Sequence, residues 1–171
     1  MKSFVFAGVI LLAAACLAQS AKPQSKGPDA AWMQQVWDAW NTLDPANAAK
    51  FYDKSPQNVY FDIAPMEYKG WAAYEAGSKK VLATFKEANC KVADAAVHNQ
   101  GNWGWGTSLV NCDAVMKDGS KSPMHFRYTG VWQKKGSEWL IVHEQISAPL
   151  PEQANSSGIQ PAAGHKRPVM E

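Results

Sequence analysis

The segment GVWQKKGSEWLIVHEQISAP, residues 130–149, decides the fold of the chain. Gly136 divides it into two runs rich in β-branched and aromatic residues, which is the pattern of a β-hairpin. Its HEQIS portion matches the start of the zinc-protease motif HExxH, which needs two histidines one helical turn apart. Here the last position is Ser147, and in a strand His143 and Glu144 point to opposite faces. The segment therefore predicts a hairpin and no metal site.

Helical and strand patterns alternate upstream of this hairpin and then give way to strands alone. The first predicted elements are a helix from Asp29 to about Leu43, a helix from Asp44-Pro45 to about Phe51, the strand VYFDI at 59–63, and a helix from Gly70 whose apolar stripe extends to Phe85. The later strands are predicted at 90–99, 103–116, 121–133 and 138–148. This order predicts one α+β domain with helices covering an antiparallel meander.

The turn at Gly101 indicates how the cysteines pair. A three-residue loop there places Cys90 opposite Cys112 on neighbouring strands. In an exported protein, facing cysteines favour a cross-strand disulfide over two buried free thiols.

The two remaining turns determine which residues share a face of the sheet. They predict two further pairs: Cys112 with His125 across Asp118-Gly119, and Arg127 with His143 across 134–136. We assign the more aromatic face to the helix-covered side: Trp103, Trp105, Leu109, Phe126, Tyr128, Trp132, Leu140, Val142, Glu144 and Ile146. The opposite face carries Asp94, Ser108, Arg127, Thr129, Trp139, Ile141, His143, Gln145 and Ser147. A single bulge would exchange the two faces.

The ends of the chain differ in composition from its middle. We divide the sequence into a signal peptide at 1–20, a linker at 21–28, a folded domain at 29–149 and a disordered tail at 150–171. Lys2 followed by an apolar run and small residues predicts export, to the periplasm or as a secreted protein. Cys16 is an alternative site for a lipid anchor, but Leu12 lies one position too far from it, which favours cleavage and release. No later segment is long and apolar enough to span a membrane.

The charge of the chain argues against nucleic acid as a partner. There are 17 basic and 15 acidic residues, and the lysines are scattered among acids and aromatics, whereas nucleic-acid binders show a basic patch. The 8 tryptophans are the more unusual feature. Aromatic side chains of this kind fill a core or, less often, line a pocket.

The closing segment also resembles the last hairpin of the SnoaL-like proteins and of the association domain of calmodulin-dependent kinase. Both belong to the nuclear transport factor 2-like (ketosteroid isomerase-like) superfamily. The shared pattern is Val131-Trp132, a Gly turn at 136, Trp139-x-Ile141-Val142-His143 and Ser147-x-Pro149. The upstream helices, the strand ending in Asp62 and the helix after Gly70 agree in order. The resemblance thus covers residues 29–149.

This resemblance implies a cone-shaped α+β barrel, in which a curved antiparallel sheet wraps around three helices and leaves a pocket at the open end. It also implies a homodimer formed through the sheet and a small-molecule ligand. Members include isomerases, cyclases, dehydratases and hydrolases. The chain departs from the pattern at Gln145, where many relatives have a second His, and at Ile146 and Gly130, where the kinase domain has cavity arginines. The anion pocket of that domain is therefore not expected here.

Glu144, Tyr128 and Asp62 are the candidate catalytic residues. A carboxylate at Glu144 on the inner face would be desolvated, which raises its pKa and suits a general base that removes a proton next to a carbonyl. Tyr128 could donate to the developing oxyanion, and Asp62 could act as a second acid or base. The commoner alternatives are a polar contact between strands for Glu144 and a turn cap for Asp62.

Five further residues are candidate ligand contacts. They are Trp105 and Trp132 on the aromatic face, Tyr60, which shares a face of its strand with Asp62, and Arg127 and His143, which would enter the pocket if the faces were exchanged. No cofactor or metal is predicted. We favour binding of a small apolar or aromatic molecule over catalysis. The alternatives are an acid/base isomerase, cyclase or dehydratase, and a dimeric assembly module with a vestigial pocket.

Overall fold

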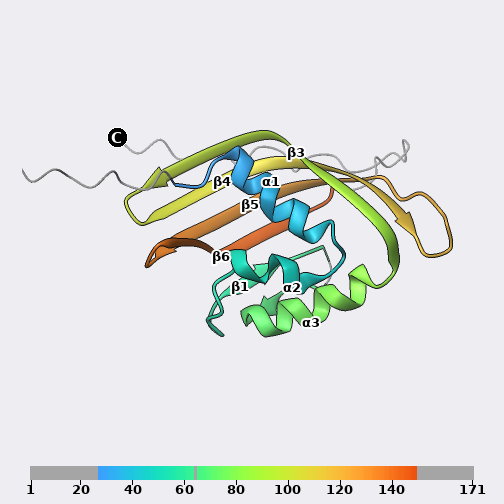
Figure 1. The fold of residues 1–171 in the computed structure, drawn as a ribbon, viewed down its shortest axis with the longest axis horizontal. Coiled ribbons are helices and arrows are strands. Elements are labelled where there is room, and N and C mark those ends of the chain that lie inside the picture. The colour runs from blue at the N-terminus through green and yellow to red at the C-terminus, as the bar shows by residue number, and fades with distance from the viewer. Residues whose placement is uncertain (1–26, 64, 150–171) are drawn as a thin grey trace, which may run out of the picture.

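The computed structural model describes residues 27–63 and 65–149 (Figure 1). The predicted signal peptide with Cys16, nearly all of the linker and the tail lie outside the described residues. The helices are α1 (Ala30–Trp40), α2 (Pro45–Ala48), the 3₁₀ helix η1 (Ala49–Phe51) and α3 (Gly70–Leu82). The strands are β1 (Val59–Phe61), β2 (Tyr68–Lys69), β3 (Phe85–Gln100), β4 (Trp103–Met116), β5 (Met124–Lys135) and β6 (Glu138–Ser147).

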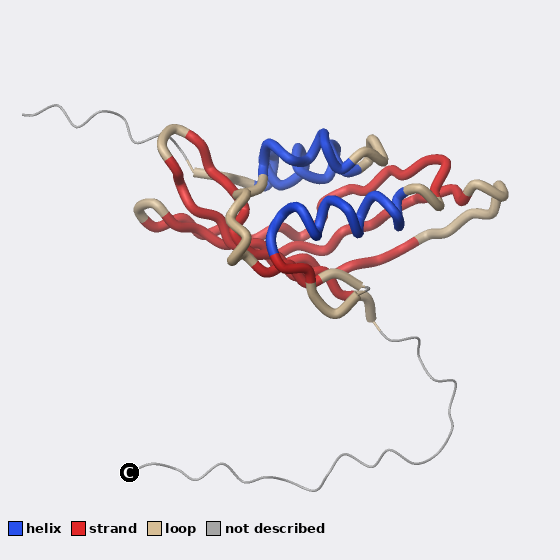
Figure 2. The backbone as a smooth tube through the Cα atoms, turned by 90° about the horizontal axis from the view of Figure 1, so that it is seen from below, coloured by secondary structure: helices blue, strands red, loops and turns tan. Residues whose placement is uncertain are grey.

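All six strands form one curved sheet in the order β2-β1-β6-β5-β4-β3. Its pairs are antiparallel except for β1 and β6, which run parallel, so the sheet is mixed. The helices lie on one side of it, as Figure 2 shows. The predicted cone of sheet around helices is therefore confirmed, with β2 and the parallel β1–β6 pair as additions.

The predicted helix starts are confirmed by their caps. The Asp29 carboxylate accepts a hydrogen bond from the backbone N–H of Trp32 at 2.9 Å, which satisfies a free donor of the first turn of α1. Asp44 does the same for Ala46 at 3.0 Å, ahead of Pro45 in α2. The end of α3 was predicted too late, because the helix stops at Leu82 and β3 begins only three residues on.

The predicted cysteine pair is also confirmed. Cys90 and Cys112 are opposite each other in the β3–β4 ladder and form a disulfide. Gly101 is in the connecting turn with φ +60°, a conformation in which glycine avoids the strain of other residues. The turn has two residues and not the predicted three, since Gln100 is opposite Trp103, and a bulge between Ala93 and Ala96 restores the register that pairs the cysteines.

The register between β4 and β5 was predicted wrongly by one residue. Cys112 is opposite Met124 and not His125, because β4 ends at Met116 and a longer connection than the expected two-residue turn at Asp118-Gly119 leads to β5. A slip of one residue moves every side chain of a strand to the other face. The predicted inward residues of β4, Trp103, Trp105 and Leu109, are therefore exposed, whereas Ser108 is buried.

The β5–β6 hairpin also differs from its prediction, because Lys135 is opposite Glu138 and the turn between them has two residues instead of the predicted three at 134–136. Arg127 is opposite Ser147, and His143 is opposite Val131, so the predicted Arg127–His143 pair is wrong. A bulge follows, since Trp132 pairs with Ile141 and leaves one extra residue on β6. The bulge turns Ile141 and Trp139 toward the helices and Leu140 away from them, the reverse of the prediction. Predicted inward positions Phe126, Tyr128, Trp132, Glu144 and Ile146 are confirmed.

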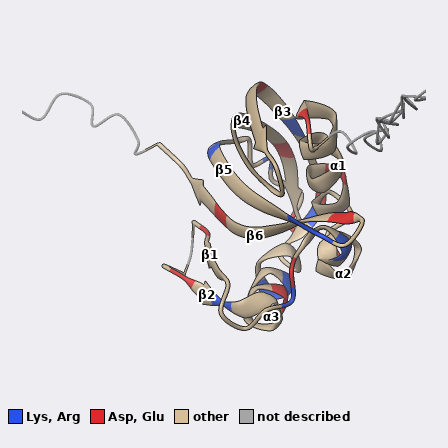
Figure 3. Ribbon diagram, turned by 90° about the vertical axis from the view of Figure 1, so that its left-hand side faces the viewer, with Lys and Arg blue, Asp and Glu red and all other residues tan. Residues whose placement is uncertain are grey.

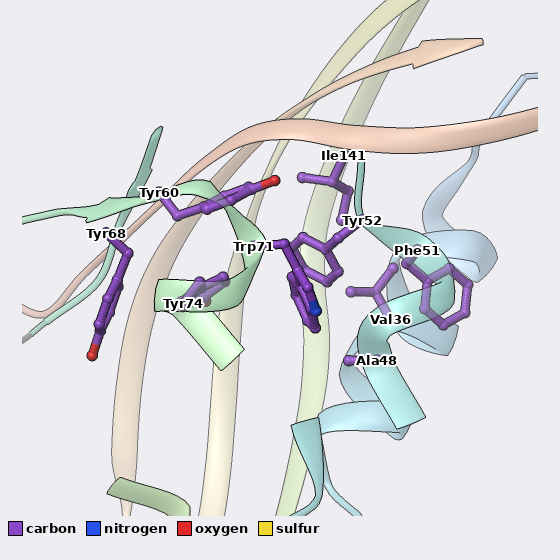
Figure 4. Packing of buried hydrophobic residues seen from close by; sticks show 9 residues of the cluster. All are labelled: Val36, Ala48, Phe51, Tyr52, Tyr60, Tyr68, Trp71, Tyr74 and Ile141. Atoms are coloured by element: carbon purple, nitrogen blue, oxygen red, sulfur yellow. The ribbon is translucent and has the colours of Figure 1, made fainter. Parts of the chain in front are cut away.

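Two groups of buried side chains fill the concave side of the sheet. The tyrosine cluster consists of Val36, Ala48, Phe51, Tyr52, Tyr60, Tyr68, Trp71, Tyr74 and Ile141 (Figure 4). The disulfide cluster consists of Met33, Trp37, Cys90, Val110, Cys112, Phe126, Tyr128 and Trp132. Helix α1 supplies residues to both clusters and so joins them.

The surface is mixed in charge. Figure 3 shows Lys and Arg interspersed with Asp and Glu along the described elements. In the same part of the chain, no helix has the length and apolar character that a membrane crossing requires.

Candidate functional site

Glu144 is the buried carboxylate at the centre of the concave side. It lies on β6, is only 1% exposed, and is opposite Gly130 on β5 and Tyr60 on β1. The HEQIS segment is part of a strand, as predicted, and its first residue, His143, donates a hydrogen bond from Nδ1 to the backbone carbonyl of Val59. Among the described residues, no group of three His, Cys, Asp or Glu side chains is placed to hold a metal ion.

Three tyrosine hydroxyls surround this carboxylate. Tyr52, just after η1, donates to Glu144 Oε2 at 2.9 Å, and Tyr74 of α3 donates to Oε1 at 2.5 Å. Tyr128 of β5 brings a third hydroxyl close to the same group, where it lowers the pKa of Glu144. The indole N–H of Trp40 donates to the Tyr52 hydroxyl at 2.9 Å, so the proton of Tyr52 is left to point at Glu144. A buried polar group therefore has a full set of partners, as its burial requires.

Burial and hydrogen bonding act in opposite directions on this group. Burial raises the pKa of Glu144, and the hydrogen bonds from its tyrosine partners lower it. The effect of burial is the larger, so the pKa is about 7. Burial and the nearby carboxylate raise the pKa of Tyr52, Tyr74 and Tyr128 well above the ordinary value of 10.0. The tyrosines thus keep their protons at neutral pH, while Glu144 can gain or lose one. This is the property that general acid/base chemistry needs.

A cavity of about 310 Å³ lies beside the carboxylate, between the two clusters. It is lined by Trp37, Trp40, Asn41, Asp62, Ile63, Tyr74, Ser78, Val81, Leu82, Phe85, Ala88, Cys90, Met124, Phe126 and Ile146. Tyr74 belongs to this lining and also donates to Glu144, whereas Glu144 and Tyr128 are not part of the wall. The Tyr74 hydroxyl therefore links the cavity wall to the buried carboxylate.

Asp62 is the acidic residue of the cavity wall. It follows β1 and its Oδ1 accepts the backbone N–H of Ile63 at 2.7 Å, so it stabilises the local chain much as the turn-cap interpretation expects. Burial raises the pKa of its carboxyl. The same residue thus both caps the local chain and faces the cavity.

The five predicted ligand contacts lie elsewhere. Tyr60 and Trp132 are fully buried in the core, where Tyr60 donates to the backbone of Asp53 at 3.1 Å and Trp132 to the side chain of Asn99 at 2.8 Å. Trp105 is 47% exposed and stacks on a histidine of the outer face of the sheet. The guanidinium of Arg127 donates a hydrogen bond to the backbone carbonyl of Ala148, and the His143 ring donates one to the backbone carbonyl of Val59. None of the five lines the cavity.

Sequence reasoning missed the residues that hold and flank Glu144. Tyr52, Tyr74, Trp37 and Trp40 come from three helical segments, and only the packing of those segments brings them together. One signal was present: Trp71 and Tyr74 recur on one stripe of the predicted third helix, which marks the side that faces the sheet.

A curved sheet around helices, with an apolar cavity beside a buried carboxylate, defines a cone-shaped α+β barrel built around a small pocket. The chain belongs to the SnoaL-like domain family, which matches residues 30–151. A search of curated proteins finds no match to the chain.

Solved structures agree with this fold. A nuclear transport factor 2-like superfamily protein from Salmonella enterica serovar Typhimurium is 21% identical, with a TM-score of 0.63 over 75% of this chain and 96% of that one. A proposed calcium/calmodulin dependent protein kinase II association domain from Xanthomonas campestris is 22% identical, with a TM-score of 0.62 over 72% and 86%. A type 2 hexachlorocyclohexane dehydrochlorinase is 12% identical, with a TM-score of 0.58 over 70% and 84%. At these identities the likeness concerns the fold alone.

Proposed function

We propose that the protein binds a small, mainly apolar or aromatic molecule in the cavity between its two clusters. The observation that carries this proposal is the cavity wall, in which aromatic and aliphatic side chains dominate and a few polar groups converge. Small-molecule sites have this composition because apolar walls supply affinity and isolated polar groups fix orientation. Membership in the SnoaL-like family supports the proposal, since this fold commonly binds small molecules or serves isomerases and dehydratases.

Blocking the cavity tests this proposal. Ala88 of β3 lines the cavity, so Ala88→Phe would fill part of it. Exposed Ala96 on the same strand offers the matched control Ala96→Phe. We expect 2-phenylethanol to quench tryptophan fluorescence in a saturable way, with Trp37 and Trp40 in the wall as reporters. Ala88→Phe should weaken binding by about tenfold or more, as an overpacked site resists the ligand. Equal binding by both variants would place the ligand elsewhere.

A second candidate function is acid/base catalysis in the same cavity, and the Glu144–Tyr74 contact favours it. Tyr74 could give its proton to a substrate atom in the cavity and recover one from protonated Glu144, or pass a proton the other way. Glu144→Gln would then abolish turnover and keep ligand affinity, in a screen of enolisable ketones and dehydratable alcohols. Unchanged turnover in that variant would assign Glu144 a structural role.

The compartment and the assembly are proposals as well. The signal-like segment at 1–20 and the Cys90–Cys112 disulfide both support export, because disulfides persist in oxidising compartments. The exposed Trp103, Trp105 and Leu109 support a homodimer through the outer face of β4. Sedimentation of the exported protein, compared with Trp105→Lys, tests the dimer: the variant should be monomeric.

A further inference from the structure

The cavity wall is one-sided in charge. Asp62 is its acidic residue, and none of the described residues that line it is Lys, Arg or His. Within 27–63 and 65–149, the Asp62 carboxylate forms no ion pair and receives only the hydrogen bond from Ile63 N–H. The carboxylate therefore retains acceptor capacity toward the cavity.

A second acidic group adds to this field. Glu144 lies behind the Tyr74 side chain of the wall, and the Asp62 charge raises the pKa of both Glu144 and Tyr74. Each of these groups thus experiences the negative charge of Asp62 through a poorly solvated interior. In such surroundings a further anion is repelled and a cation is attracted more strongly than in water.

Aromatic faces and an unused hydroxyl complete the wall. Trp37, Trp40, Tyr74 and Phe126 supply aromatic rings, whose faces attract cations. Ser78 is 5% exposed, and its hydroxyl has no hydrogen-bond partner among the described residues. A buried hydroxyl of this kind can accept a hydrogen bond from an N–H group of a ligand.

We propose that the cavity selects apolar ligands with a protonated primary or secondary amine and discriminates against those with a carboxylate or phosphate. The apolar body would occupy the aromatic interior, and the ammonium group would lie against Asp62. This inference rests on the proposed function, because it specifies the class of molecule that the same cavity takes. The kinase association domain has cavity arginines where this chain has Gly130 and Ile146. Without them, the described wall has no positive charge to bind an anionic ligand.

Three probes of one skeleton separate charge from shape. They are 2-phenylethylamine, 2-phenylethanol and phenylacetate, which are cationic, neutral and anionic at pH 7. Titration calorimetry on the full exported chain should give an amine affinity about tenfold or more above that of the alcohol, in line with a partly desolvated cation–aromatic and ion-pair contact. Phenylacetate should bind more weakly than the alcohol.

Matched variants test the part played by Asp62. Asp62→Asn keeps an oxygen to accept the Ile63 N–H, and should lower amine affinity about tenfold while leaving that of the alcohol unchanged. The control Asp94→Asn removes the same charge from an exposed site whose positive φ of 49° asparagine also tolerates, and should change nothing. Equal affinities for amine and alcohol, or an unchanged preference in Asp62→Asn, would overturn the charge selection and leave cavity binding intact. Failure of all three probes to bind would overturn both proposals.

Discussion

The two clusters on the concave side of the sheet are stabilised by different means. The tyrosine cluster contains four of the five tyrosines of the chain, and the hydroxyls of Tyr52 and Tyr74 end on one buried carboxylate. The disulfide cluster combines the covalent Cys90–Cys112 bond with apolar packing, and sends a single hydroxyl, that of Tyr128, to the same carboxylate. One half thus depends on mutual satisfaction of polar groups, and the other on a crosslink and dispersion.

This difference explains where chemistry can take place. A disulfide and packed methyl groups have no proton to exchange near neutral pH, whereas a buried carboxyl among hydroxyls does. The cavity lies where the halves meet, so a ligand would contact the apolar Phe126 of one and the Tyr74 of the other. Polar networks stabilise only when complete, which makes the tyrosine half the more vulnerable to a single substitution.

The largest effect is expected from Glu144→Ala. The substitution leaves a void and removes the acceptor of the Tyr52 and Tyr74 hydroxyls, so we expect the free energy of unfolding to fall by about 4 kcal/mol. Urea denaturation followed by tryptophan fluorescence would measure the loss. Glu144→Gln is the control, since it retains one acceptor oxygen and the volume, and should cost less than half as much. If the alanine variant is as stable as the wild type, the network contributes nothing to the fold.

Removal of the disulfide is the matching test of the other half. The bond closes a loop with a sequence separation of 22, for which loop-closure entropy predicts a loss of about 3 kcal/mol in the Cys90→Ala/Cys112→Ala double variant. The difference between the halves predicts that this variant keeps the network around Glu144, so its ultraviolet spectrum should still report buried tyrosines. If the variant loses both its stability and the spectrum of buried tyrosines, the two halves do not fold as separable units.

pH should act on the tyrosine half through Glu144. Because the folded chain holds the pKa of Glu144 near 7, above the ordinary value of 4.5, the folded state binds this proton more tightly than the unfolded state. Stability should therefore fall as pH rises from about 4.5 to 7 and level off above 7, by roughly 2 to 3 kcal/mol from this group. The measurement is the wild-type stability minus that of Glu144→Gln across this range. A flat difference would place the folded pKa at its ordinary value.

The two halves also differ in how far the sequence could predict them. The cysteine pair was predicted correctly from one local turn, although the turn is one residue shorter than predicted and a bulge between Ala93 and Ala96 offsets the difference. The partners of Glu144 could not follow in the same way. Tyr52, Tyr74 and Tyr128 are distributed over the chain, and their meeting depends on how η1 and α3 pack on the sheet.

Small local features account for the misplaced residues. The longer β4–β5 connection shifts the register by one residue and put Trp105 on the wrong face, and the bulge near Ile141 did the same to Trp139. Asp62, predicted to end a strand, follows β1 and lies in the cavity wall. The sequence thus predicted the helix starts and one cross-strand pair, whereas turn lengths, bulges and the packing of helices on the sheet were not readable from it.

Gly130→Ala gives the smallest and sharpest test of the polar half. Gly130 is opposite Glu144, and a Cβ added there would lie 2.5 Å from the hydroxyl oxygen of Tyr128, so the missing side chain leaves room for that hydroxyl beside the carboxylate. We expect the substitution to cost about 2 kcal/mol through overpacking, measured by urea denaturation.

A double-mutant cycle identifies the cause of that cost. In a Tyr128→Phe background the clashing oxygen is absent, so Gly130→Ala should cost only about 1 kcal/mol, the remainder reflecting the ring carbon that a Cβ would still approach at 3.0 Å. An equal cost in both backgrounds would show that Gly130 is required by the strand itself. A reduced cost would show that glycine is needed at position 130 because a side chain there would displace the Tyr128 hydroxyl from the Glu144 carboxylate.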